Sequence, residues 1–273
     1  MTKVVVLGDL NADIVAVQST SLALGSDTAA RVSLMPGGGG ANVAAWLAKA
    51  GVDVTLIGRV GKDALAPVGL SGLDGVDLQV VRDPLHATGT CVVLVAPGGE
   101  RTMLPDPGAN DALSADDLPP LEGDVLHVSG YALLRPGSRT AALAAIERAR
   151  DAGMKISVDP ASAAPLSNDP VFLQRIAPID LLLPNADEAA VLGPQIDVPE
   201  LVTTRGRRGA TWTDGITRIE QAALNADDVV DTTGAGDAFA AGFLSAWPEG
   251  SPERALLKGA ELAAQAIART GGR

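Results

Sequence analysis

The feature that most limits the fold of this chain is a regular alternation between short apolar runs and alanine-rich stretches. The apolar runs are continuous, which is typical of strands covered on both faces, as in a parallel sheet with helical crossovers. They predict strands over residues 3–8, 52–58, 124–130, 154–160, 179–185 and 200–206. The other stretches predict helices over 41–51, 138–153, 186–193, 237–247 and 252–269. We therefore predict a three-layer α/β/α fold with a mainly parallel central sheet.

Two regions depart from this alternation and predict a second, smaller sheet. Residues 13–34 alternate short polar and apolar segments, and residues 88–104 form two apolar runs joined by Pro97-Gly98-Gly99, the pattern of a hairpin. We expect a small β-sheet lid built from about 10–34 and 78–105. Because no long polar linker divides the chain, both segments belong to one predicted domain over 1–273.

Composition excludes several classes of function. The formal net charge of −12 argues against a general nucleic-acid or membrane-surface role, since both need a positive patch. The single cysteine, Cys91, allows neither an internal disulfide nor a cysteine metal cluster. The N-terminal apolar run is too short for a signal peptide, and no apolar stretch is long enough to span a membrane. We expect a cytoplasmic protein.

Several phosphate-binding and catalytic motifs are missing from the sequence. It contains no G-x-x-x-x-G-K-[ST], and no G-x-G-x-x-G follows the first strand, because Gly8 precedes Asp9 and Leu10. The H-E-x-x-H and G-x-S-x-G motifs are absent too. P-loop enzymes, dinucleotide-binding dehydrogenases, zinc proteases and α/β-hydrolases are therefore disfavoured.

The segment "DTTGAGDAFAAGF", residues 231–243, joins a glycine-rich turn to a helix. The amide groups of Gly234, Ala235 and Gly236 lie at the positive end of that helix, where they can stabilise a phosphoryl group during transfer. Asp237 follows them, in position to accept the proton of an attacking hydroxyl. A structural alternative stays open, in which Asp237 only complements the helix dipole.

Two further segments offer groups for a polyhydroxyl ligand. In "PGGGGAN", residues 36–42, a glycine run lets a ligand approach the backbone, and Asn42 adds a donor and an acceptor. In "LNADIV", Asn11 and Asp13 follow the first strand, and Asp13 can accept bonds from two neighbouring hydroxyls. For each segment the alternative is a turn capped by an Asx side chain.

Five segments of the sequence together carry a family resemblance. "GDLNADIV", "PGGGGANVA", "LLLPNADEA", "VTTRGRRGA" and "DTTGAGDAFAAGF" occur in the order and spacing of the PfkB or ribokinase-like sugar kinases, from about residue 3 to 268. The resemblance implies ATP-dependent phosphorylation of a hydroxymethyl group on a sugar or nucleoside. Asp237 resembles the family's general base, and the amides of 234–236 resemble its anion hole. The positions that resemble its substrate-binding residues are Asn11, Asp13, Gly38, Gly39 and Asn42.

The resemblance also implies how ATP and metal ions are held. Asn185 and Glu188 match an N-x-x-E motif that serves the phosphates and the water shell of Mg²⁺, and one helical turn separates them. Thr204, Gly206 and Gly209 resemble the nucleotide loop. Asp231 and the carbonyl group of Thr233 match positions that hold a monovalent cation, usually K⁺, in many members, and a site with or without this ion stays open here. Lid sheets in this family often pair, which makes a homodimer an expectation.

The sequence departs from ribokinases at positions that bear on the substrate. Gly39 stands where ribokinases usually carry lysine, and "HVSGYALL" lacks their acidic residue near 129–131. Tyr131 either stacks on a substrate ring or packs in the core, and we favour packing. His127 lies in an apolar strand and predicts a hydrogen-bonded core histidine. A sugar kinase is the leading hypothesis, a nucleoside kinase the second and a ligand-binding relative without catalysis the third.

Overall fold

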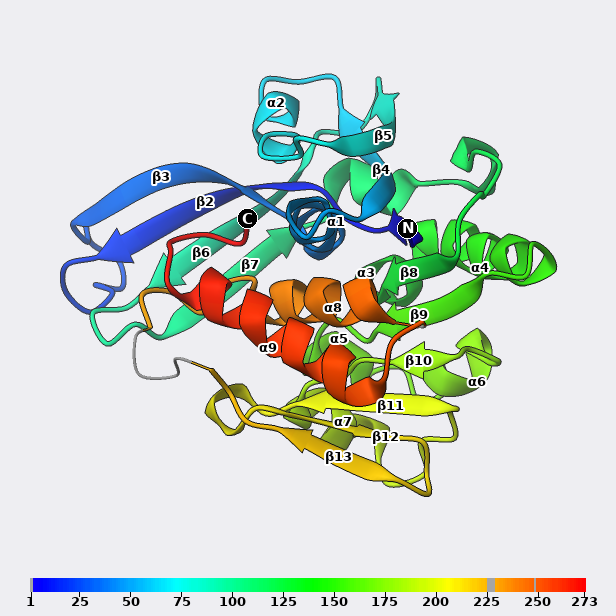
Figure 1. Cartoon of the computed structure of the whole chain (residues 1–273). Coiled ribbons are helices and arrows are strands. Elements are labelled where there is room, and N and C mark those ends of the chain that lie inside the picture. Colours follow the sequence, from blue (N-terminus) through cyan, green and yellow to red (C-terminus); the bar gives the residue numbers. More distant parts are fainter. Residues whose placement is uncertain (1, 225–228, 248) are drawn as a thin grey trace.

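The computed structural model describes residues 2–224, 229–247 and 249–273, which form a large sheet between two layers of helices and a small sheet beside it (Figure 1). The large sheet has the strand order β13-β12-β11-β10-β9-β8-β1-β4-β5 and is parallel from β11 to β5. Its strands are β1 (Lys3–Leu7), β4 (Asp53–Gly61), β5 (Val76–Asp83), β8 (Val125–Ser129), β9 (Lys155–Asp159), β10 (Leu181–Leu182), β11 (Glu200–Thr204), β12 (Ala210–Thr213) and β13 (Arg218–Gln221). The predicted fold class is confirmed.

The two faces of the large sheet bury separate cores, as the alternation of side chains along a strand requires. In β1, Val4 and Val6 join the core beneath α1, α8 and α9, whereas Val5 and Leu7 join the core beneath α4. The helices are α1 (Gly39–Lys49), α2 (Ala66–Gly69), α3 (Gly130–Leu134), α4 (Pro136–Asp151), α5 (Ala163–Leu166), α6 (Phe172–Ile176), α7 (Ala186–Leu192), α8 (Ala235–Ala246) and α9 (Pro252–Ile267). None of the helices in the described ranges is both long and apolar enough to cross a membrane.

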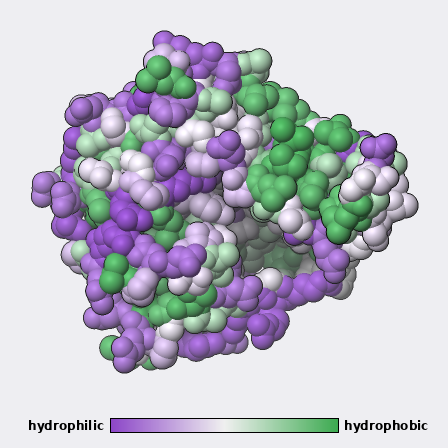
Figure 2. All heavy atoms as spheres, turned by 180° about the vertical axis from the view of Figure 1, so that it is seen from behind, coloured by the Kyte–Doolittle hydropathy of each residue, from purple (hydrophilic) through white to green (hydrophobic). Residues whose placement is uncertain are grey.

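The small sheet, which we call the lid, has the strand order β3-β2-β6-β7. Its strands are β2 (Asn11–Gln18), β3 (Ala30–Gly37), β6 (Gly89–Val95) and β7 (Arg101–Asp106). The lid projects from one side of the large sheet (Figure 1), and the molecule is hollowed between the two (Figure 2).

The predicted lid segments need two corrections. Residues 78–83 belong to β5, which pairs in parallel with β4 at the edge of the large sheet, and β3 extends the first lid segment to residue 37. β5 is largely exposed, and an edge strand of that kind lacks the continuous apolar run that marks the central strands. Its sequence therefore resembles that of a lid strand.

Candidate active site

The site is built at the carboxyl ends of the parallel strands, where open α/β sheets bind ligands. Asp9 follows β1, Ser129 ends β8, Asp159 ends β9 and Thr204 ends β11. Asn185, which follows β10, is held beside Thr204 by an isolated parallel bridge. The N-termini of α1 and α8 approach the same edge of the sheet. Side chains that are far apart in the sequence thus meet in one place.

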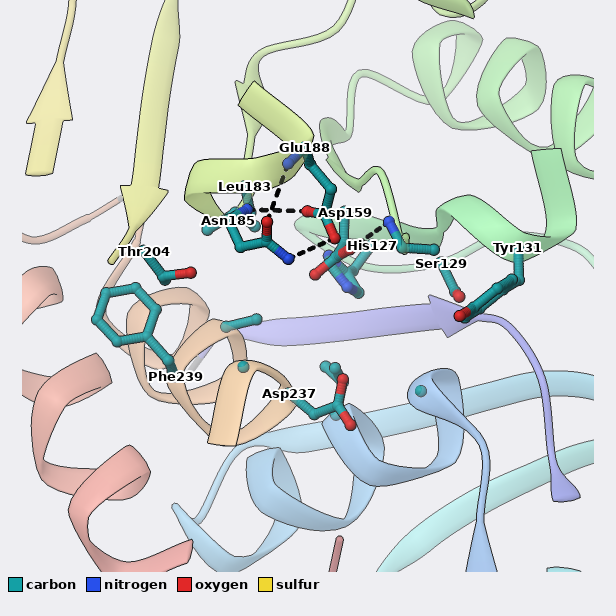
Figure 3. Close-up of a pocket in the computed structure, with 15 residues that line it drawn as sticks. His127, Ser129, Tyr131, Asp159, Leu183, Asn185, Glu188, Thr204, Asp237 and Phe239 are labelled. Carbon is teal, nitrogen blue, oxygen red and sulfur yellow. Dashed lines mark hydrogen bonds between the residues drawn. The ribbon is translucent and has the colours of Figure 1, made fainter. Parts of the chain in front are cut away.

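Three cavities adjoin each other along this edge. A lid cavity of about 230 Å³ lies between the lid and the large sheet, and a central cavity of about 140 Å³ is shown in Figure 3. An apolar cavity of about 390 Å³ lies between the β11–β12 turn and α9. Asp237 and Gly39 border both the lid cavity and the central cavity, whereas Gly236 and Asn185 border both the central and the apolar cavity.

Each residue predicted for the site borders at least one of these cavities. The lid cavity is bordered by Asn11, Asp13, Gly38, Gly39, Asn42, Asp231, Thr233, Gly234 and Asp237. Glu188 borders the central cavity. The apolar cavity is bordered by Asn185, Thr204, Gly206, Gly209, Ala235 and Gly236. The structure therefore brings the predicted residues together, and their individual roles stay predictions.

Asp237 lies in the first turn of α8 and points into the central cavity, towards α1 (Figure 3). Its Oδ2 accepts a hydrogen bond of 2.8 Å from Nδ2 of Asn42. Burial raises the pKa of Asp237 to about 7, and the neighbouring Asp159 and Asp9 also raise it. A carboxylate with a pKa near the working pH is well suited to accept and release a proton.

The turn before α8 leaves two amide groups without an acceptor in the described structure. Gly234 adopts a left-handed conformation with φ of 71°, and a Cβ there would lie 2.6 Å from Cα of Gly272, so glycine is required. The amides of Gly234 and Gly236 have no protein acceptor among the described residues. The amide of Ala235 already donates to the carbonyl of Thr232 at 3.3 Å. Two of the three predicted amides are thus available to an anion.

The lid cavity gathers hydrogen-bonding groups near the lid's base. Oδ1 of Asp13 is buried without a partner in the described structure, and burial together with Asp9 raises the pKa of this carboxyl to about 6. The side chain of Asn11 is held by Asn110, whose Nδ2 donates to Oδ1 of Asn11 at 2.9 Å. A ligand hydroxyl that reaches the orphaned oxygen of Asp13 would satisfy it.

Glu188 and Asn185 form the capping box of α7. Oδ1 of Asn185 accepts from the amide of Glu188 at 3.0 Å, and Oε2 of Glu188 accepts from the amide of Asn185 at 2.8 Å. Burial raises the pKa of Glu188 and that of its neighbour Asp159, the latter to about 7. No group of three His, Cys, Asp or Glu side chains in the described ranges can hold a metal ion alone. This donor set fits Mg²⁺ that is bound chiefly by phosphates and water.

Hydrogen-bond donors surround the carboxylate of Asp231, one of the two predicted ligands of a monovalent cation. Its carboxylate accepts hydrogen bonds from the amide and hydroxyl groups of Thr233 and from the amide of Gly271, and it also pairs with Arg101. With Arg101 paired to it, the carboxylate faces hydrogen-bond donors, whereas a hard cation at the same place needs oxygen ligands.

Sequence reasoning missed four residues of this site. The carboxylate of Asp9 accepts from the amides of Gly39 and Gly40 at 3.3 and 3.4 Å, and it lies at the end of the first parallel strand, which was a usable signal. Asp159 ends another parallel strand. For Arg101 and Arg273 no local pattern points to the site. Nη1 of Arg273 donates to Oδ1 of Asn42 at 3.1 Å.

His127 lies in the core, whereas Tyr131 borders the cavities. His127 is buried, and its Nδ1 lies 3.1 Å from Oγ of Ser157, so it is the predicted hydrogen-bonded core histidine. Burial lowers its pKa to about 4. Tyr131, for which packing was favoured, instead borders both the central and the lid cavity, with the guanidinium of Arg135 4.9 Å from its ring centre.

Comparisons with known proteins agree with this geometry. A fructokinase from Klebsiella pneumoniae is 33% identical over 269 residues, which cover 89% of this chain and 83% of that one. An adenosine kinase from Sinorhizobium meliloti superposes with a TM-score of 0.87 at 23% identity, covering 100% and 95% of the two chains. A ribokinase II from E. coli, solved with ATP and Mg²⁺, also gives 0.87 at 23% identity, covering 100% and 94%. The model of the pfkB family carbohydrate kinases matches residues 1–273. The chain therefore belongs to the pfkB family of carbohydrate kinases, the ATP-dependent sugar kinases that its motifs resemble.

Proposed function

We propose that the chain transfers the γ-phosphoryl group of ATP to a hydroxymethyl group of a small sugar. The observation that carries this proposal is the position of Asp237, whose carboxylate borders the lid cavity on one side and the central cavity on the other. A sugar in the lid cavity would present its hydroxyl to Asp237, while a phosphate enters the central cavity from the opposite side.

The base and the anion hole then act on different atoms. Asp237 accepts the proton of the hydroxyl as its oxygen attacks phosphorus. The free amides of Gly234 and Gly236 and the positive end of α8 stabilise the charge on the phosphoryl oxygens. Asn11, Asp13 and Asn42 bind the other hydroxyls of the sugar, next to the backbone of Gly38 and Gly39.

ATP fits the two remaining cavities. The apolar cavity is lined mostly by alanine and other apolar side chains, which suits the adenine ring, and Gly206 and Gly209 form the turn beside it. From there the phosphates extend past Asn185 and Gly236 to the central cavity. Bound Mg²⁺ would neutralise part of the charge on the phosphates, and Glu188, which borders the central cavity, would hold the ion's water ligands.

The decisive experiment replaces the base without changing its shape. Asp237→Asn should lower kcat with ATP and the best sugar by about 10²–10⁴-fold, the usual effect of losing a general base. Asp214→Asn, an exposed aspartate in the β12–β13 turn, is the matched control and should be fully active. A loss of less than about tenfold in Asp237→Asn would show that Asp237 is not the base.

A nucleoside kinase is the second candidate, and the lid favours it. Val15 and Val93 pair across β2 and β6, Met103 faces Val93 from β7, and all three border the lid cavity. This apolar row suits a flat base, and Gly39 leaves space for it. Thermal-shift assays with ribose, fructose, adenosine and pseudouridine separate the candidates, because a true ligand stabilises the fold by mass action. A binding relative without catalysis would consume no ATP with any of them.

We also propose that the lids of two chains pair. Apolar side chains gather on the lid (Figure 2), and Val32, Leu34 and Leu104 are 63%, 48% and 55% exposed. An exposed apolar patch on a strand surface is typical of an interaction site. Leu34→Glu should convert a dimer to a monomer in light-scattering measurements, whereas Leu85→Glu, outside the lid, should not. A monomeric unmodified protein would contradict this proposal.

A further inference from the structure

An arginine of the lid, Arg101, contacts the turn that precedes the predicted anion-binding amides. Arg101, the first residue of β7, pairs through Nη2 with Oδ1 of Asp231. The two side chains are only 22% and 16% exposed, so this pair is largely withdrawn from solvent. The turn that leads to Gly234 begins at Asp231. One guanidinium therefore links the lid to the segment that supplies the anion-binding amides.

The carboxylate of Asp231 organises that segment. Oδ1 accepts from the amide of Thr233 at 2.8 Å and from its hydroxyl at 2.7 Å, and Oδ2 accepts from the amide of Gly271 at 3.1 Å. Gly271 in turn precedes Gly272, which packs against Gly234. A change in the charge balance at Asp231 would therefore reach Gly234, the left-handed residue that precedes α8.

The contacts of the Asp231 carboxylate suit its charged form. The amide and hydroxyl groups of Thr233, the amide of Gly271 and the guanidinium of Arg101 all donate to it. A charged, largely buried carboxylate needs a compensating cation. In the described structure the guanidinium of Arg101 supplies that charge, at the position for which the family resemblance implies a monovalent ion.

We propose that the guanidinium of Arg101 takes the place of a monovalent cation at Asp231, so that this kinase needs no K⁺. The fork of N–H groups on arginine matches a carboxylate, and it needs none of the additional oxygen ligands that an ion would require. The activity part of this inference rests on the proposed function, whereas the ion-binding part stands on its own.

The test compares Arg101 with Arg31, which lie at the two ends of one row of cross-strand pairs in the lid. Val95 pairs with Arg101 on one side, while Val17 pairs with Val95 and, on its other side, with exposed Arg31. Arg101→Gln removes the charge at Asp231, and Arg31→Gln is the matched control. Each protein is assayed in KCl and in choline chloride at equal ionic strength, both for kcat/KM and for thermal unfolding.

The unmodified protein and Arg31→Gln should show the same kcat/KM and the same melting temperature in both salts. Arg101→Gln should lose about 10- to 100-fold in kcat/KM in choline chloride, the range for a lost hydrogen bond to a charged group. K⁺ should restore part of that loss, and it should raise the melting temperature of Arg101→Gln alone, because the ion binds the vacated carboxylate. Arg101→Lys keeps the charge, and its kcat/KM in choline chloride should lie between those of the unmodified protein and Arg101→Gln.

Two results would overturn the inference. One is a stimulation of the unmodified protein by K⁺ of about tenfold or more over choline. The other is full activity of Arg101→Gln in choline chloride, which would show that Asp231 needs no cation. If no acceptor is phosphorylated, the proposed function fails, and the melting temperatures alone then decide whether Arg101 excludes K⁺. If Arg101→Gln does not fold, Arg101→Lys and the salt response of the unmodified protein decide.

Discussion

Replacing Asn42 with alanine should move the acid limb of the pH–rate profile to higher pH. Asn42 lies in α1 and donates through Nδ2 to Oδ2 of Asp237 at 2.8 Å. Its Oδ1 accepts from Nη1 of Arg273 at 3.1 Å, which fixes the end of the amide that faces Asp237. The amide can only donate to the carboxylate, so it stabilises the ionised form of Asp237, the form that acts as a base.

The size of the shift follows from the opposing contributions at Asp237. The net pKa is about 7: burial raises it most, the hydrogen bond from Asn42 lowers it, Asp159 and Asp9 raise it, and Arg273 lowers it. Glu188 also lies close enough to interact with this charge. A hydrogen bond to a charged group contributes about 1.5–3 kcal/mol, and one pKa unit corresponds to about 1.4 kcal/mol. Removing the amide should therefore raise the pKa of Asp237 by about one to two units.

The resulting loss of activity depends on pH. At about pH 7.5 the ionised fraction of Asp237 falls from about three quarters to a quarter or less, so kcat/KM falls at least threefold from this cause alone. At about pH 9.5 most of the carboxyl is ionised in either protein, and this part of the loss disappears. Loss of contacts between Asn42 and the sugar lowers the whole profile without moving its midpoint.

The assay is kcat/KM for the sugar between about pH 6 and 10, with ATP and Mg²⁺ saturating. The control is Asn168→Ala, because the side chain of Asn168 donates to the carbonyl of Ala164 at an exposed position. We expect midpoints near 7 for the unmodified protein and the control, and about 8–9 for Asn42→Ala. A midpoint that stays in place while activity falls equally at every pH would refute the reasoning.

Three further predictions concern stability and metal affinity. Asp237→Asn should raise the free energy of unfolding at about pH 8 by about 1–3 kcal/mol in urea titrations. The carboxyl of Asp237 has a folded-state pKa above its ordinary value, so the stability that its neutral form contributes is lost as pH rises from about 4 to 7, and asparagine stays neutral. An unchanged urea midpoint would contradict the raised pKa. Gly39→Ala should raise KM for the sugar with little change in melting temperature, since a Cβ there meets Oδ1 of Asp237 at 3.6 Å, an ordinary contact. Gly38→Ala should instead lower stability by about 1–3 kcal/mol, because φ is 97° and the added atom would lie 2.4 Å from the carbonyl oxygen of Asp9; equal melting temperatures for the two variants would refute this contrast. Glu188→Gln should raise the Mg²⁺ concentration needed for half-maximal activity about tenfold, and an unchanged requirement would remove this carboxylate from the ion's shell.

The sequence predicted those parts of the fold that depend on local pattern. A run such as "VVVL" in β1 is apolar at each position because the two faces of the large sheet bury different cores, and this signal is visible without any tertiary knowledge. The predicted first residue of a helix was less accurate where a group distant in the sequence caps that helix. We predicted the helix from residue 41, but it begins at Gly39, because the carboxylate of Asp9 accepts the amides of Gly39 and Gly40.

The site was predictable only where one short segment carries its chemistry. The segments around Asn185 and Asp237 place their own groups, since helix geometry and turn chemistry fix them locally. The pairing of Asn42 with Asp237 spans 195 residues, and that of Arg101 with Asp231 spans 130. Such contacts result from the packing of whole elements, and no spacing in the sequence encodes them.

The acids of the central cavity also bear on the structural alternative for Asp237. An aspartate that only complemented a helix dipole would gain from a position in solvent, where its charge is stabilised at no cost. Here Asp159, Glu188 and Asp237 all border one small cavity, and burial raises the pKa of each of them. Gathering them opposes folding whenever they are charged, and a bound Mg²⁺ would relieve that repulsion. The arrangement costs stability without a ligand, as is usual for sites built to bind and react.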